Sequence, residues 1–146
     1  MACKVFGLFF FIAVATSGTS ALTQIFLEDE HITFLTNDLI GKTLTIPKFT
    51  FDTLQSCHVV LPNGAMVEAY LNNELNDPHI TFLEAVQPFV SCGIGFVGAP
   101  TTYSGTYELY SVVDDWTGLG LSLTRKKFHL TLTEGDSWLI PSENKQ

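Results

Sequence analysis

Period-two alternation of side chains is the feature that most limits how this chain can fold. It recurs in four stretches, and in each the positions of one parity would share a face if the stretch were extended. These positions are Phe49, Phe51, Cys57, Val59 and Leu61; Cys92, Ile94 and Phe96; Tyr107, Leu109, Ser111 and Val113; and Phe128, Leu130 and Leu132. No window of a dozen residues keeps the i, i+3, i+4, i+7 stripe of an amphipathic helix. The pattern predicts an all-β protein.

Turn-forming residues separate these stretches, which predicts short strands with tight connections. The turn signals are Pro62-Asn63-Gly64, residues 72–78, Gly98-Ala99-Pro100, Asp114-Asp115 and Glu134-Gly135-Asp136. Because no helices are expected between the strands, the pattern favours a sandwich or a barrel over a doubly wound sheet. The chain has 146 residues, which is enough for one domain.

Composition excludes several classes of protein. With 46% hydrophobic and only 15% charged residues, the chain is too apolar to be disordered. Its net charge of −8 argues against a nucleic-acid partner, whose phosphates need a basic face, and against a polybasic membrane anchor.

The N-terminus has the three-part layout of a secretory signal peptide. Lys4 precedes an apolar run over residues 5–15, and small residues follow over 16–21, with Thr19 and Ala21 at the −3 and −1 positions. The apolar run is about half the ~20 residues that a membrane-spanning helix needs. We expect cleavage after Ala21, with Ser17, which follows Ala15, as the second candidate. The mature protein is predicted to be extracellular, without a stable membrane anchor.

Removal of the signal peptide removes Cys3 and leaves Cys57 and Cys92. The oxidising secretory route favours a disulfide between them, with two free buried thiols as the alternative. Closing a loop of roughly 35 residues would stabilise the fold by about 3–4 kcal/mol. The two cysteines lack the spacing of a metal site, and no metal or other cofactor is expected.

A family resemblance is carried by residues 102–110, Thr-Tyr-Ser-Gly-Thr-Tyr-Glu-Leu-Tyr. They resemble the stretch that leads into strand F of immunoglobulin-like domains, where a tyrosine hydroxyl bonds the backbone a few residues upstream. The resemblance implies an immunoglobulin-like antiparallel β-sandwich over residues 40–135, after an N-terminal segment (22–39) and before a C-terminal tail (136–146). It implies that Tyr107 and Gly105 form the structural corner, with the tyrosine bonded near residues 99–102.

The same resemblance assigns the strands. Strand B would fall at residues 55–61, strand C at 67–71, strand E at 92–97 and strand G at 127–134. The chain departs from the family in two ways, because Leu109 stands where the second cysteine is usual and no tryptophan lies between Cys57 and Cys92. The disulfide is therefore expected to join strands B and E within one sheet, as in the secreted invertebrate modules that the chain resembles.

Two motifs that suggest enzyme chemistry lack the required context. Residues 93–98 match the dinucleotide pattern G-x-G-x-x-G, and Asp114 lies about 20 residues further on. Pro100 and the residues after it cannot continue the helix that this motif needs, so a strand approached closely by another backbone is expected. Residues 120–124 are one glycine short of a nucleophile elbow. The four histidines are scattered and are expected at the surface, and a non-enzymatic protein is predicted.

Three charged stretches remain. The acidic run 28–31 is expected to be a solvated segment, since it lacks the alternate spacing and glycine of a calcium loop. The basic cluster 125–127 favours a solvated turn or the protection of an edge strand. Asp114, Asp115 and Trp116 form a possible binding loop, because an exposed tryptophan is a frequent contact residue; a tryptophan that caps the core is the alternative.

These observations favour a secreted recognition module that binds an extracellular protein, glycan or lipid through its loops or a sheet face. One alternative is a β-barrel carrier of a small hydrophobic ligand, with some of the 12 phenylalanines lining a cavity. Another is an extracellular structural or assembly component. A filled core between two sheets would favour the first class over the carrier.

Overall fold

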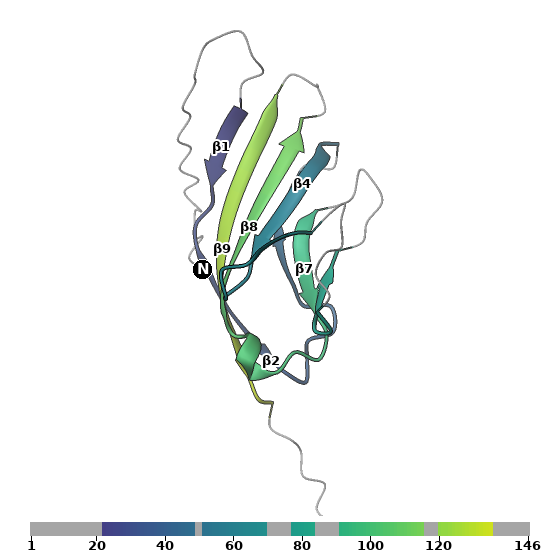
Figure 1. The fold of residues 1–146 in the computed structure, drawn as a ribbon, viewed down its shortest axis with the longest axis vertical. Helices are drawn as coiled ribbons and strands as arrows, with labels where there is room; N and C mark the ends of the chain where they lie inside the picture. Colours follow the sequence, from purple (N-terminus) through teal and green to yellow (C-terminus); the bar gives the residue numbers. More distant parts are fainter. Residues whose placement is uncertain (1–21, 49–50, 70–76, 84–90, 116–119, 136–146) are drawn as a thin grey trace, which may run out of the picture.

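The computed structural model describes residues 22–48, 51–69, 77–83, 91–115 and 120–135 (Figure 1). The expected signal peptide, the C-terminal tail and Trp116 lie outside these residues. The described part holds nine strands and one 3-10 turn. They are β1 (Leu22–Phe26), β2 (Glu30–Leu35), β3 (Thr43–Ile46), β4 (Thr53–Val60), β5 (Met66–Glu68), β6 (Ile80–Phe82), β7 (Cys92–Phe96), η1 (Thr101–Tyr103), β8 (Gly105–Asp114) and β9 (Leu121–Thr133).

The strands form two sheets (Figure 1). The larger has the order β1-β9-β8-β4-β5, and β2 also pairs with β9. The long strands β8 and β9 run antiparallel and form its centre, whereas β1 and β2 pair with β9 in parallel, one after the other along its length. The smaller sheet is antiparallel and has the order β3-β7-β6.

A continuous hydrophobic core fills the space between the sheets. Tyr107, Leu109 and Phe128 enter it from the larger sheet, and Leu44 and Ile94 enter it from the smaller one. Each of these side chains is at most 2% exposed. The ring of Tyr107 meets the ring of Phe96, from the opposite sheet, edge to face with 5.6 Å between centroids. The arrangement is a β-sandwich.

The strand order is that of an immunoglobulin-like domain. In that fold strands B, E and D share one sheet, strands C, F and G share the other, and variable-type domains add strands beyond C. Here the positions of strands B, E and D are taken by β3, β7 and β6, in that order. The positions of strands C, F and G are taken by β4, β8 and β9, and β5 lies beyond β4. The expected placement of strands E, F and G agrees with this order. Residues 55–61 are strand C rather than B, and Val67 and Glu68 belong to the added strand β5 rather than to C.

Because Cys57 lies on strand C rather than on strand B, the disulfide takes a different route from the expected one. Cys57 and Cys92 are bonded as predicted, 35 residues apart and each 1% exposed. The expectation of a bridge within one sheet is wrong, because β4 pairs with β8 in the larger sheet and β7 pairs with β3 and β6 in the smaller. The bond therefore crosses the core and ties the two sheets together.

The sandwich also begins earlier than residue 40. Residues 22–39 contain β1 and β2, which cover one side of β9 and make it an interior strand. In β4, a register shift between Leu54 and Ser56 changes which parity faces the core. Leu54 and Cys57 are thus both buried, whereas Phe51 is 75% exposed and does not share their face. No helix in the described ranges is long and apolar enough to cross a membrane.

Candidate functional site: the outer face of the larger sheet

Two central strands build a polar surface on the outer face of the larger sheet. Because side chains alternate along a strand, the buried set of β8 leaves Thr106, Glu108 and Tyr110 facing outward. In β9 the outward set includes Arg125, Lys127 and His129. The register places these residues opposite one another as Thr106 with His129, Glu108 with Lys127, and Tyr110 with Arg125.

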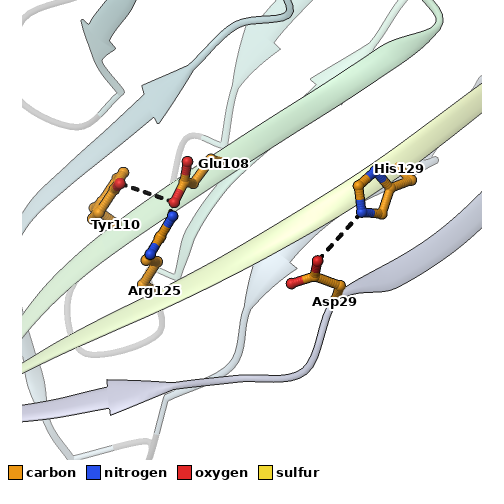
Figure 2. Close-up of polar contacts among 5 residues, drawn as sticks. All are labelled: Asp29, Glu108, Tyr110, Arg125 and His129. Atoms are coloured by element: carbon orange, nitrogen blue, oxygen red, sulfur yellow. Dashed lines mark hydrogen bonds and ion pairs between the residues drawn. The ribbon is translucent and has the colours of Figure 1, made fainter.

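Arg125 is the centre of an aromatic and charged cluster on this face (Figure 2). Its Nε donates to Oε1 of Glu108, and the Tyr110 hydroxyl donates to the same oxygen at 2.9 Å. The guanidinium carbon lies 5.8 Å from the centroid of the Tyr110 ring and 6.0 Å from that of Phe26. Since the Phe26 side chain is 60% exposed, the cluster presents an aromatic ring and a held guanidinium to a partner.

A second cluster joins two histidines that are far apart in the sequence. The parallel pairing of β2 with β9 places His31 opposite His129, and their rings stack with 4.5 Å between centroids. Nδ1 of His129 lies 3.0 Å from the Thr106 hydroxyl, and its Nε2 lies 3.4 Å from Oδ2 of Asp29 (Figure 2). Sequence reasoning missed this cluster, because a register between strands 98 positions apart has no local signal.

A small depression lies between the two clusters. It is at the segment that connects β1 to β2, where the chain is not fully paired with β9. The backbone N–H of Leu27 still donates to the carbonyl of Arg125 at 2.9 Å, but pairing resumes only at Glu30. The depression has a volume of about 160 Å³. Its lining residues are Phe26, Leu27, Asp29, Arg125 and Lys127.

The basic cluster 125–127 lies in the middle of the larger sheet, so the expectation of a turn or an edge strand is wrong. Lys126 has the inward parity, and its ammonium lies 4.7 Å from the centroid of the Phe128 ring and 2.5 Å from Oε2 of Glu30. Arg125 is paired with Glu108. Within the described part of the chain, the Lys127 ammonium has no hydrogen-bond or ion-pair partner.

The acidic run 28–31 is exposed, as expected for a solvated segment, but its residues also contact the larger sheet. Glu30 and His31 belong to β2, and three of the four residues reach β9: Asp29 contacts His129, Glu30 contacts Lys126, and His31 stacks on His129. In the described residues, no group of three or more His, Cys, Asp or Glu side chains is arranged to hold a metal ion.

The residues of the implied corner lie at one end of the sandwich. Tyr107 is 1% exposed, and its hydroxyl donates to the carbonyl of Tyr103 at 2.8 Å, one residue beyond the expected range. Burial raises the pKa of the Tyr107 hydroxyl well above its ordinary value of 10.0. Burial and a hydrogen bond to Asp77 raise the pKa of Tyr103 as well.

Gly105 begins β8 with a φ of +152°. A Cβ atom at this position would lie 2.7 Å from Cβ of Pro62. Both the backbone angle and the close approach therefore require glycine.

Of the possible binding loop, Asp114 and Asp115 lie at the end of β8. Asp114 pairs with Leu121, and the N–H of Asp115 donates to the carbonyl of Gly120 at 3.1 Å. Trp116 lies outside the described residues. The structure does not join these aspartates to the clusters of Figure 2, which lie further along the same strands.

The glycine motif has a packing role in β7. All five residues of β7 are buried, and a Cβ atom on Gly93 would lie 2.5 Å from the carbonyl oxygen of Leu44. The close approach of the β3 backbone is thus the reason for this glycine. The next element is the short turn η1 rather than the α-helix that a dinucleotide site needs.

Similarity to known proteins is found among solved structures. No family model matches the chain, and no curated protein matches it. Among solved structures, the immunoglobulin-like domain of human leucine-rich repeat-containing protein 4 is similar, with 14% sequence identity and a TM-score of 0.39. The match covers 75% of this chain and 86% of that domain. The strand order described above, together with the tyrosine corner, makes this chain an immunoglobulin-like β-sandwich.

Proposed function

We propose that this protein is a secreted, non-enzymatic recognition module that binds an extracellular protein through the outer face of its larger sheet. The contact surface is the group formed by Phe26, Tyr110, Arg125 and Lys127, named here the β1-β9 patch. The observation that carries the proposal is the position of Arg125 beside Tyr110 and the exposed ring of Phe26.

Three properties of the patch support this role. Aromatic residues and arginine dominate the energetic centres of protein interfaces. Glu108 holds the Arg125 side chain in place before any partner arrives, which lowers the entropy lost on binding. The patch rests on paired strands rather than on a loop, so its side chains have a fixed spacing.

The test is capture of partners from the extracellular fluid of the source organism on immobilised protein. Phe26→Ala should lower the amount of the captured partner at least about tenfold, since truncating a central aromatic contact typically costs 2 kcal/mol or more. The matched control is Phe51→Ala, which removes another exposed phenylalanine, 75% exposed, from the turn before β4.

Capture that falls with Phe26→Ala and survives Phe51→Ala supports the proposal. Equal capture by both variants and the unchanged protein would overturn it. Sedimentation at micromolar concentration gives a second check, because a stable oligomer that dissociates on Phe26→Ala would identify the patch as an assembly interface instead.

A further inference from the structure

We infer that the depression between β1 and β2 is a pocket for one acidic side chain, a glutamate, supplied by the protein partner. The inference rests on the proposed function and names the chemistry that the β1-β9 patch recognises. The residues that would hold the glutamate are Lys127, Phe26 and Leu27.

The size of the depression sets the size of its ligand. Its volume of about 160 Å³ is below the roughly 300–1,000 Å³ of sites that enclose a drug-sized molecule. A single side chain from a larger partner fits such a space. The backbone on either side of the depression already pairs with β9, at Phe26 and at Glu30, so the depression is open to a side chain rather than to an added strand.

Lys127 gives the depression a cation that can bind an anion. Arg125 is paired with Glu108, and Oδ2 of Asp29 lies 3.4 Å from Nε2 of His129. Lys127 is half-buried, and among the described residues its ammonium has no hydrogen-bond or ion-pair partner. A carboxylate that enters the depression would therefore complete an ion pair with Lys127 while leaving the existing pairs in place.

The apolar wall favours glutamate over aspartate. Phe26 and Leu27 line the depression beside the charged groups, and Leu27 packs against the core. The two methylene groups of a glutamate can lie against these side chains while its carboxylate reaches the ammonium. Aspartate has one methylene and would reach less far.

The test is a titration of isotope-labelled protein with the peptide acetyl-Ala-Leu-Glu-Leu-Ala-amide, followed through backbone amide resonances. Resonances of residues 26–29 and 125–127 should shift. The peptide with Gln in place of Glu should bind at least about tenfold more weakly, because the charge-assisted pair is lost. Lys127→Met should cause the same loss, whereas the control Lys42→Met removes an exposed lysine just before β3 and should cause none.

Equal affinity of the Glu and Gln peptides, unchanged binding by Lys127→Met, or no binding of the Glu peptide at about 10 mM would each overturn the inference. Partner capture separates the two proposals. Capture that falls with Phe26→Ala but survives Lys127→Met would overturn the glutamate pocket and leave the recognition face standing. Capture that survives both changes would overturn both.

Discussion

At the scale of single residues, the Tyr107 hydroxyl is a structural group whose removal has a defined effect. Tyr107→Phe deletes its hydrogen bond to the Tyr103 carbonyl and leaves that partly buried acceptor without its partner. We expect the free energy of unfolding, measured in urea, to fall by about 1–3 kcal/mol. Tyr110→Phe is the control. In this variant Glu108 keeps its contact with Arg125, so the free energy of unfolding should fall by less than about 1 kcal/mol. Equal losses for the two variants would contradict the corner.

Gly105 allows a second test at this scale. Gly105→Ala combines an unfavourable φ with a 2.7 Å contact to Pro62, so we expect a loss of about 2–4 kcal/mol in urea unfolding. The control is Gly98→Ala, where φ is +57° but no atom lies within 4 Å of the added Cβ. That change should cost only about 1 kcal/mol. A similar loss at both positions would show that the contact with Pro62 has no effect.

At the scale of elements, β7 should distinguish its two glycines. Gly93→Ala places Cβ against the rigid backbone of β3, so we expect a loss of about 2–4 kcal/mol in urea unfolding. In Gly95→Ala the closest atom to the new Cβ is the Thr81 hydroxyl at 3.0 Å, a side-chain atom that can turn away, so the loss should be less than about 1 kcal/mol. The prediction would be wrong if Gly95→Ala were the more harmful change.

The disulfide acts between elements, because it joins β4 and β7 across the core. Reduction should lower the free energy of unfolding by about 3–4 kcal/mol, through the greater freedom of the unfolded chain. Urea unfolding with and without a reducing agent measures the loss. The double variant Cys57→Ala/Cys92→Ala is the control and should not respond to the reducing agent. Two alkylatable thiols in the untreated native protein would contradict the bond.

At the scale of the whole molecule, the predicted signal peptide and the fold are compatible. Cleavage after Ala21 would make Leu22 the first residue, and β1 begins at that residue. Expression of the full chain in secretory cells should therefore release protein whose N-terminal sequence starts at Leu22 and keeps β1 intact. A released protein that starts at Met1, or one that starts within β1, would contradict the prediction.

Local patterns in the sequence determined the class of the fold and several of its details. Alternation along residues 107–113 and 128–132 predicted the two central strands, because the parity of a strand is contained in a few neighbouring residues. The stretch around Gly105 and Tyr107 predicted the corner for the same reason, since its hydrogen bond spans four residues. Cleavage of the predicted signal peptide would leave two cysteines, so their pairing could be predicted from the sequence.

The tertiary structure alone decided which strands became neighbours. The sheet of β7, and therefore the route of the disulfide across the core, depends on pairing between distant segments that alternation does not encode. The recruitment of β1 and β2 to β9 turned an apparent edge into an interior strand and brought Phe26 and Asp29 beside Arg125 and His129. The candidate site is built from these long-range pairings, and each of its halves looks like an ordinary solvated segment until the sheet brings them together.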